Sequence, residues 1–283
     1  MPALTLKDRA VIAVNGEEAA HFLGATVTCD VEGLADGTAV PGALLTPQGK
    51  ILFDFMIMRS GEESFLLDCP AASAGDFVRR LTMYKLRAKV EISLRDESLV
   101  SVAWDSDSGV DGAVPGRDAR FKDTEVTRLI GPADFGGDAL DDWNALRIAN
   151  GVAQSGSDYA LGDAFPHDVN LDQIGGISFT KGCYVGQEVV SRMQHRGTAR
   201  RRVLVATADA DLPASGTEIA ADGRPLGTLG TVAGKTGLAL CRIDRVADAV
   251  TAGRAITTGA VALRLAVPPH AGFTIEVKNG DEA

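Results

Sequence analysis

Residues 180–192 read TKGCYVGQEVVSR, and two glycines bracket the Cys-Tyr-Val step within this stretch. Glycine lets a backbone turn sharply or come close to another group, so the stretch predicts a tight loop. Residues 187–195 read as a helix, which would leave Lys181 and Cys183 just ahead of its amino-terminal end. That end of a helix carries free N–H donors and a partial positive charge. The loop is therefore suited to an anion or a thiolate, or it is a tight turn around a small buried cysteine.

The composition is that of a globular protein. The chain has 283 residues, of which 45% are hydrophobic and 23% are charged, and this length allows two or three domains. No stretch approaches the roughly 20 apolar residues of a membrane span. The first twenty residues have neither the apolar core of an export signal nor an Arg-rich amphipathic start. We therefore expect a cytoplasmic protein with no membrane partner.

The charge is acidic overall but basic in one window. A net charge of −10 argues against a protein whose main task is to grip nucleic acid directly. Residues 181–202 hold six bases and one acid, a local balance of +5. This basic strip predicts a local anionic ligand, or else it is a solvated helix face followed by a charged loop. Its bases are Lys181, Arg192, Arg196, Arg200, Arg201 and Arg202.

Cysteine usage excludes several kinds of site. The four cysteines are far apart in the sequence, no C-x-x-C pair occurs, and the four histidines are scattered. This pattern fits a reducing compartment and excludes a disulfide framework and a zinc site. It also lacks the clustered thiolates that a single chain needs for its own iron–sulfur centre. We therefore assign no metal site. The cysteines are Cys29, Cys69, Cys183 and Cys241.

The amino-terminal half alternates strands and helices in an order typical of an α+β domain with an antiparallel sheet. One helix is expected to begin at a cap on Asn15, and a second is expected over 71–87. Residues 105–120 are rich in Asp, Ser and Gly and are predicted to form a flexible loop. Strands are expected at 10–14, 39–45, 51–58, 64–69, 90–94 and 98–104.

The rest of the chain changes character twice. Residues 139–149 read as a helix, whereas 151–178 have almost no periodicity. Loops of this length in compact domains are usually functional or disordered, and this one leads directly into 180–192, so we favour a functional loop. From Arg202 onward, short strands alternate with glycine turns, which predicts a separate antiparallel barrel or sandwich. Its strands are expected at 203–207, 217–220, 226–233, 237–243 and 255–266.

KGCYVGQE at 181–188 resembles the K-G-C-Y-x-G-Q-E signature of the YgfZ-like folate-binding proteins. These proteins are relatives of the glycine-cleavage T-protein, which is an aminomethyltransferase. The resemblance extends over most of the chain. Further similar segments are FLGATVTCDVEGL at 22–34, LLTPQGKILFDF at 44–55, YKLRAKVEI at 84–92, WNALRIANG at 143–151 and FPHDVNLD at 165–172.

The resemblance implies an α+β fold in which two intertwined domains and a carboxy-terminal β-barrel form a ring around a central hole. Tetrahydrofolate or one of its one-carbon derivatives is expected to bind in that hole. The corresponding domains would be 1–45 with 125–200 for the first, folate-binding domain, 46–124 for the second, and 201–283 for the barrel.

The resemblance also implies a role in assembling or repairing iron–sulfur clusters, chiefly for four-iron enzymes, including those that modify tRNA. The expected partners are iron–sulfur assembly proteins or client enzymes. The alternative is a folate-dependent aminomethyltransferase. T-proteins carry two adjacent aspartates where this chain has Phe53-Asp54, and they lack the cysteine of the signature, so a true aminomethyltransferase is not expected. A third possibility is a folate-binding tRNA protein that contacts phosphate through Arg196 and residues 200–202, which the acidic net charge disfavours.

Two residues of the signature are expected to carry its chemistry. Lys181 and the helix amino terminus would together stabilise Cys183 as a thiolate, since both favour negative charge. Cys183 would then act as a nucleophile or as one ligand of a transient cluster. Because it stands alone, the other ligands would come from partners or glutathione.

Six residues are candidates for binding folate. Tyr184 would stack on the flat pterin, and Asp168 would accept two parallel hydrogen bonds from its N–H and amino donors. Asp168 is otherwise a loop acid in solvent. Glu188 and Arg192 lie one helical turn apart, so they either contact the ligand or stiffen the helix. The full set is Asp54, Asp168, Tyr184, Gln187, Glu188 and Arg192.

Overall fold

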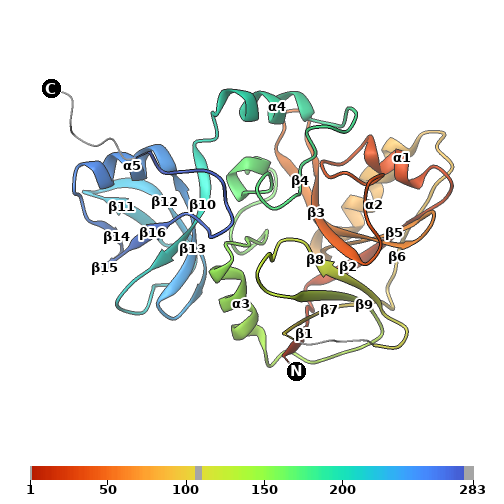
Figure 1. Ribbon diagram of the computed structural model, residues 1–283, viewed down its shortest axis with the longest axis horizontal. Coiled ribbons are helices and arrows are strands. Elements are labelled where there is room, and N and C mark those ends of the chain that lie inside the picture. Colours follow the sequence, from red (N-terminus) through yellow and green to blue (C-terminus); the bar gives the residue numbers. More distant parts are fainter. Residues whose placement is uncertain (1, 106–109, 277–283) are drawn as a thin grey trace. The chain divides into compact units, whose positions relative to one another are not determined.

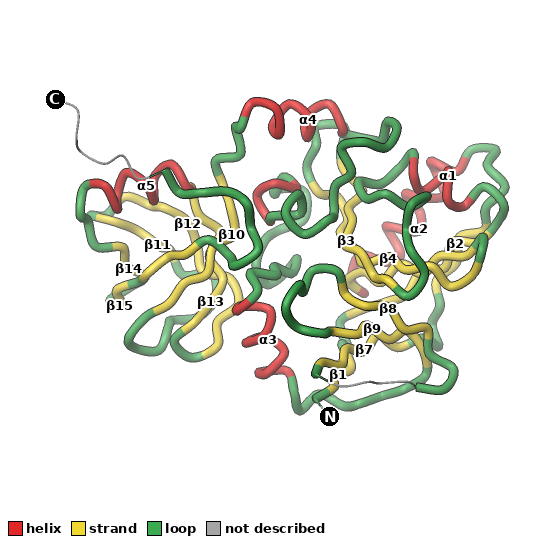
Figure 2. Tube along the Cα trace, viewed as in Figure 1, coloured by secondary structure: helices red, strands yellow, loops and turns green. Residues whose placement is uncertain are grey.

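A computed structural model describes residues 2–105 and 110–276 and divides the chain into two compact units (Figure 1). The first unit comprises Met1–Leu140 and Ile174–Ser191, and the second comprises Asp141–Gln173 and Arg192–Ala283. Both units are rich in strands, as Figure 2 shows. The three-domain division expected from the sequence stays a prediction. No helix among the described residues is long and apolar enough to cross a membrane.

The first unit is built on a nine-stranded sheet with the order β1-β7-β9-β8-β3-β4-β5-β2-β6. Neighbouring strands pair antiparallel, except that β3 and β8 run parallel. All six strands expected from the sequence are confirmed. The strands are β1 (Ala3–Thr5), β2 (Arg9–Asn15), β3 (Thr38–Leu45), β4 (Ile51–Gly61), β5 (Ser64–Pro70), β6 (Glu91–Leu94), β7 (Leu99–Trp104), β8 (Val114–Asp118) and β9 (Val126–Gly131).

The prediction of a loop over 105–120 was wrong where β8 lies, and residues 106–109 are outside the described residues. Two features explain why a polar, glycine-containing segment joins the sheet. Gly116 packs so closely on β3 that an added Cβ would lie 3.2 Å from the backbone nitrogen of Ala39. Asp118 is fully buried, and Arg120 donates to its carboxylate at 2.6 and 2.9 Å. Burial opposes ionisation of Asp118, but Arg120 and Arg128 hold the pKa of this carboxyl below its usual value.

Two helices belong to the first unit, namely α1 (Ala19–Gly24) and α2 (Ala71–Lys85). The helix expected over 71–87 is confirmed as α2. The expected cap at Asn15 was wrong, because Asn15 is the last residue of β2 and pairs with both β5 and β6. Asn15 is therefore still part of the sheet and does not begin a helix.

The core of the first unit lies between the sheet and α2. Alternate residues of β4 point into it, and the rings of Phe53 and Phe55 stack on Phe77 of α2 at centroid distances of 4.8 and 5.5 Å. Offset stacking adds to the burial of such large apolar rings. The strand period of two then places Asp54 on the opposite face of the sheet.

The second unit contains a seven-stranded antiparallel sheet with the order β15-β14-β11-β12-β13-β10-β16. The expected strands are confirmed, although 255–266 is split into three short ones. A helix after β13 was missed, and it packs on β12 and β13 through Val246 and Ala249 (Figure 1). The strands are β10 (Arg201–Thr207), β11 (Glu218–Ala221), β12 (Arg224–Ala233), β13 (Thr236–Arg242), β14 (Ile256–Thr258), β15 (Val261–Ala262) and β16 (Arg264–Ala266), and the helix is α5 (Ile243–Thr251).

Three further elements connect or flank these sheets. The helix expected over 139–149 is confirmed as α3 (Leu140–Ala149). The long aperiodic segment contains one short 3-10 helix, η1 (Pro166–Val169), and an isolated bridge between Ser155 and Tyr159. The helix expected to follow the signature is confirmed as α4 (Gln187–Arg196).

Residues 180–186, here called the signature loop, pack by their backbone against the turn between β3 and β4. Gly186 has a φ of +81°, and a Cβ added there would lie 2.6 Å from the carbonyl oxygen of Thr46. Gly49, in the turn itself, has a φ of +80°, and its added Cβ would lie 2.7 Å from the Cβ of Val189. Only glycine adopts this conformation without strain and also leaves room for the neighbouring chain. The loop is therefore held against the β3–β4 turn at a fixed position.

We expect Gly186→Ala to lower the free energy of unfolding by about 1–3 kcal/mol, because it combines a positive φ with a backbone collision. Thermal and urea unfolding would measure the change. Gly182→Ala is the matched control in the same loop, since its added Cβ would meet nothing within 4 Å and its φ is not positive. Equal losses for the two variants would contradict this account of the loop.

Candidate functional site

Cys183 is the one exposed cysteine of the four. The other three, Cys29, Cys69 and Cys241, are buried, and burial raises the pKa of each thiol to about 12. The thiolate is the form of cysteine that attacks electrophiles and binds metals. Cys183 is thus the sulfur that can meet a group from outside the molecule, whereas the others are inert core residues.

Lys181 does not face Cys183 in the way that the sequence predicted. Its ammonium donates to the carbonyl oxygen of Gly24 at 2.6 Å and also to that of Val27. Gly24 ends α1, where unpaired carbonyls and the negative end of the helix dipole favour a cation. Burial lowers the pKa of Lys181, while Cys29 and the nearby acids oppose that shift. Lys181 therefore ties the signature loop to α1.

Tyr184 is not available as a stacking platform. Its side chain is 7% exposed, and the Lys181 ammonium lies 4.8 Å from the centre of its ring. Its hydroxyl is buried and has no hydrogen-bond partner among the described residues. Burial raises the pKa of this phenol to about 12. The predicted stacking of Tyr184 on a pterin is corrected accordingly: the ring is part of the wall behind the signature loop.

Asp168 is neither a solvent-exposed acid nor a free acceptor. It lies in η1 and is 2% exposed. One carboxylate oxygen accepts from the backbone N–H of Phe165 at 2.9 Å and from Arg201 at 2.8 and 3.2 Å. Burial raises the pKa of Asp168, although Arg201 opposes this. The sequence predicted that Asp168 would accept hydrogen bonds from a pterin. In the structure it accepts them from Phe165 and Arg201 of the second unit instead.

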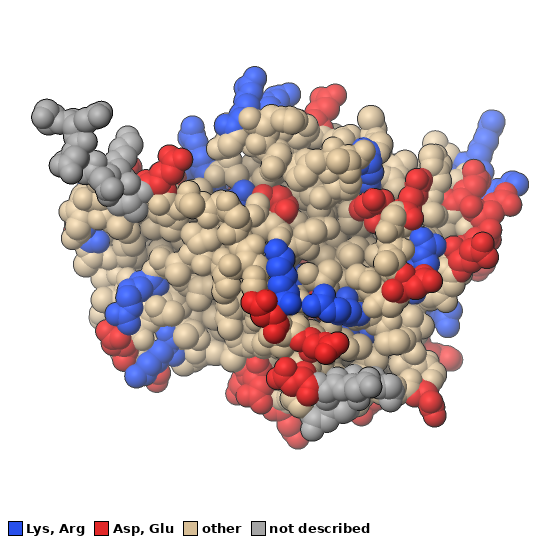
Figure 3. All heavy atoms as spheres, viewed as in Figure 1, with Lys and Arg blue, Asp and Glu red and all other residues tan. Residues whose placement is uncertain are grey.

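The basic strip of residues 181–202 is not a continuous anion-binding surface. Arg201 also pairs with Asp163 at 3.0 Å, and Arg202 pairs with Asp172 at 2.5 Å. Together with Lys181, these three cations have partners inside their own units. The remaining three are exposed, and Figure 3 shows basic side chains projecting where α4 lies. Those three are Arg192, Arg196 and Arg200.

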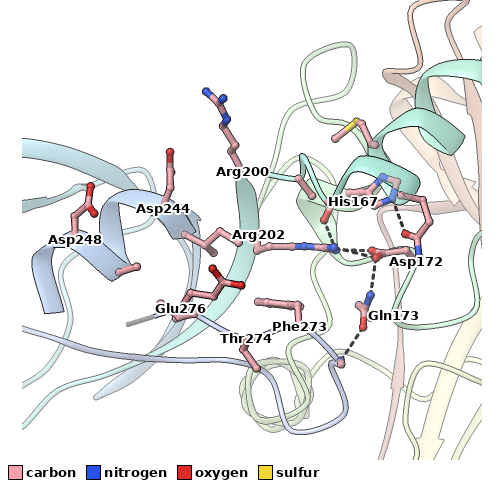
Figure 4. Close-up of a pocket in the computed structure, with 18 residues that line it drawn as sticks. His167, Asp172, Gln173, Arg200, Arg202, Asp244, Asp248, Phe273, Thr274 and Glu276 are labelled. Atoms are coloured by element: carbon pink, nitrogen blue, oxygen red, sulfur yellow. Dashed lines mark hydrogen bonds and ion pairs between the residues drawn. The ribbon is translucent and has the colours of Figure 1, made fainter. Parts of the chain in front are cut away.

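Sequence reasoning missed a cavity of about 590 Å³ in the second unit. Figure 4 shows Arg202 in its wall, pointing toward Asp172 and His167, and the guanidinium lies 4.8 Å from the ring centre of Phe273. Acidic and basic residues share the rim, among them Arg200, Asp244 and Glu276. The walls come from four separate segments, at 167–173, 193–202, 243–248 and 272–276, so no local motif pointed to the cavity.

The other predicted site residues are spread over both units. Asp54 is half-buried on β4 close to Arg9; burial lowers the pKa of Arg9, but Asp68 and Asp54 raise it above its usual value. Gln187 is half-buried at the start of α4, and Glu188 and Arg192 are exposed on the same helix. Asp168 and Arg192 belong to the second unit, and the remaining candidates belong to the first.

These arrangements do not fit a reduced folate held by Asp168 and Tyr184. The carboxylate of Asp168 is paired with Arg201, and the ring of Tyr184 is buried beneath Lys181. Both side chains thus serve the protein's own structure. Among the described residues there is also no group of three or more His, Cys, Asp or Glu side chains that could hold a metal ion.

Comparison with known proteins relates these features to a family. Residues 200–273 match the family model described as CAF17, C-terminal beta-barrel domain. The chain is 32% identical to the mitochondrial iron-sulfur cluster assembly factor IBA57 homolog of Pyricularia oryzae, over 88% of this chain and 73% of the relative. It is 31% identical to mitochondrial IBA57 of Mus musculus, over 85% and 77%, and 30% identical to that of Homo sapiens, over 93% and 83%.

A solved structure confirms the expected fold class. The glycine cleavage system aminomethyltransferase T of Bartonella henselae aligns with a TM-score of 0.72 over 95% of this chain and 86% of its own. At 16% sequence identity, this likeness concerns the fold alone. The protein therefore has the aminomethyltransferase-like α+β fold with a carboxy-terminal β-barrel domain.

Two expectations from the sequence are refined by these comparisons. The relatives are IBA57 proteins, within the same superfamily as the YgfZ-like proteins that the signature suggested, and the narrower YgfZ assignment is not confirmed. The expected cytoplasmic location is contradicted, because these relatives are described as mitochondrial.

We expect Cys183 to react with iodoacetamide at least about tenfold faster than the other three cysteines, because those are buried and hard to deprotonate. Timed alkylation with mass-spectrometric mapping would measure the four rates. The same experiment in denaturant is the control, and there the four thiols should react alike. Faster labelling of Cys29, Cys69 or Cys241 in the folded protein would refute the assignment.

We expect Lys181→Met to lower the free energy of unfolding by about 1–3 kcal/mol, since two carbonyls lose their donor. The alkylation rate of Cys183 should stay within about twofold of the parent, because the ammonium faces α1. Lys7→Met, at an exposed lysine of the same unit, is the control for loss of charge. If alkylation slowed about tenfold while stability was unchanged, Lys181 would instead be acting on the thiolate.

Proposed function

Because this chain belongs to the IBA57 family of iron–sulfur cluster assembly factors, we propose that it assembles clusters by offering Cys183 as its single thiolate ligand. The observation that carries the proposal is that Cys183 is the one exposed cysteine and lies in a loop that the chain holds in place. Lys181 ties the loop to α1, and Gly186 packs it on the β3–β4 turn. The sulfur is thus presented at a fixed place on the surface.

A single thiolate cannot hold a cluster, since iron–sulfur clusters are usually bound by four cysteine ligands. The remaining cysteines of this chain are buried, and no alternative set of ligands occurs among the described residues. The other ligands must come from a second molecule, either an assembly protein or glutathione. The cluster is accordingly cargo shared at the surface, and Cys183 releases its proton when it binds iron.

The space around Cys183 suits such sharing. An added Cβ on Gly182, the residue before the cysteine, would meet nothing within 4 Å, so no described side chain other than those of its two neighbours crowds that side of the loop. The loop does not rely on flexibility to reach a partner, because its backbone is fixed on the β3–β4 turn. A preorganised ligand loses less entropy when the shared complex forms.

The aminomethyltransferase alternative is not favoured. The residue before Asp54 is Phe53, which is 6% exposed and stacks on Phe77 in the core. The second carboxylate of the T-protein pair therefore has no counterpart at this position. A shared fold does not imply a shared catalytic activity, because function depends on the side chains placed on the fold.

We expect Cys183→Ser to fold and melt like the parent, since an exposed sulfur contributes little packing. In cells that lack the native protein, this variant should fail to support four-iron enzymes, whose activities and bound iron would be measured. Thr180→Ala is the matched control, being an exposed residue of the same loop without a sulfur. Full support by Cys183→Ser would overturn the proposed role.

A further inference from the structure

A concavity of about 450 Å³ lies in the first unit between α1 and the carboxyl end of α2. Phe22 of α1 and Tyr84 of α2 line it, and Val185 of the signature loop forms part of its wall. Val185 is two residues from Cys183, and two Cα–Cα steps span at most about 7.6 Å. A group that fills this concavity is therefore close to the exposed sulfur.

Leu86, which follows α2 and lines this concavity, has an unusual backbone conformation for a leucine. Its side chain is 88% exposed, and its backbone has a φ of 48° and a ψ of −104°. Leucine rarely adopts a positive φ, whereas glycine does so easily. Met83, in the last turn of α2, is a second large apolar residue with 67% exposure. Strained backbone positions cluster at ligand clamps and switch regions, so the conformation of Leu86 points to a functional surface.

The charges around Leu86 are basic, although the whole chain has a net charge of −10. Lys85 and Arg87 line the concavity, and neither has an ion-pair partner in the part of the chain that the structure describes. Glu18, the acid in the lining, already accepts a hydrogen bond from the backbone N–H of Lys89. His21 interacts with Glu32 at 3.3 Å on the far rim. An acidic partner repelled by the rest of the surface would be steered to this place.

We propose that Met83, Leu86, Lys85, Arg87 and Val185, here called the Leu86 surface, dock the acidic face of the assembly protein that shares the cluster with Cys183. The partner inserts an apolar side chain into the concavity and places carboxylates against Lys85 and Arg87. Docking here brings the partner's cluster ligands next to Cys183. This inference rests on the proposed function, since it identifies the surface that receives the second ligand donor.

A photo-crosslinking amino acid at position 86 of the full chain would test the contact in cells. We expect an adduct with an acidic protein that itself binds iron–sulfur clusters, identified by mass spectrometry. Arg87→Glu should lower the adduct yield about tenfold, as for an interface residue that carries much of the binding. Arg95→Glu is the matched control, because it makes the same charge change at an exposed residue outside the surface. An adduct with a second copy of this chain, with a protein that binds no cluster, or no adduct at all would overturn the proposal.

Leu86→Gly separates docking from folding. We expect its melting temperature to equal or exceed that of the parent because the strained φ is relieved, and Cys183 should alkylate at the parent rate. Support of four-iron enzymes should nevertheless fall to the level of Cys183→Ser. Leu94→Ala, at another exposed leucine of the same unit, should leave that support intact. If Leu86→Gly supported four-iron enzymes normally and Cys183→Ser failed to do so, the docking surface alone would be refuted. If both variants supported these enzymes normally, the proposed function would be refuted.

Discussion

The contact between the signature loop and the β3–β4 turn is the constraint on which the rest of the site depends. Two backbones approach each other at Gly186 and Gly49 so closely that neither position has room for a side chain. Lys181 holds the same loop from the other direction through the carbonyls at the end of α1. Cys183 lies between these two attachments in the sequence and is exposed.

The signature residues therefore divide into those that build the loop and the one that can react. Lys181 and Tyr184 form a half-buried pair, an ammonium over an aromatic ring, and the ring is part of the wall behind the loop. Under the proposed function this arrangement favours cluster sharing, since a sulfur held at a fixed place loses little entropy when the shared complex forms. Burial of the other three thiols leaves Cys183 as the one exposed thiol of the four cysteines.

The same fold occurs in an aminomethyltransferase and in this chain, and the likeness concerns the fold alone. At the β4 position where a transferase needs a second acid, Phe53 contributes to the core instead. At the signature loop, a cysteine is added. The charges of Arg9, Asp68, Asp118 and Arg128 satisfy one another within the sheet, so they contribute to stability and specificity of packing more than to a reaction. The chemistry therefore depends on single side chains displayed by a shared framework.

The sequence by itself determined what depends on residues close together in the chain. The strand period of β3 to β5, the helical patterns of α2, α3 and α4, and the two glycines around Cys183 are all local signals, and each predicted its element correctly. The signature was also enough to indicate the superfamily. Only the tertiary structure decided which distant groups meet. Lys181 donates a hydrogen bond to the carbonyl oxygen of Gly24, 157 residues away, and Arg201 pairs with Asp168, 33 residues away. A count of charges within residues 181–202 could not predict either contact. The polar segment at 114–118 became strand β8 because it pairs with β3, which is distant in the sequence, and such pairing leaves no periodic trace in a sequence.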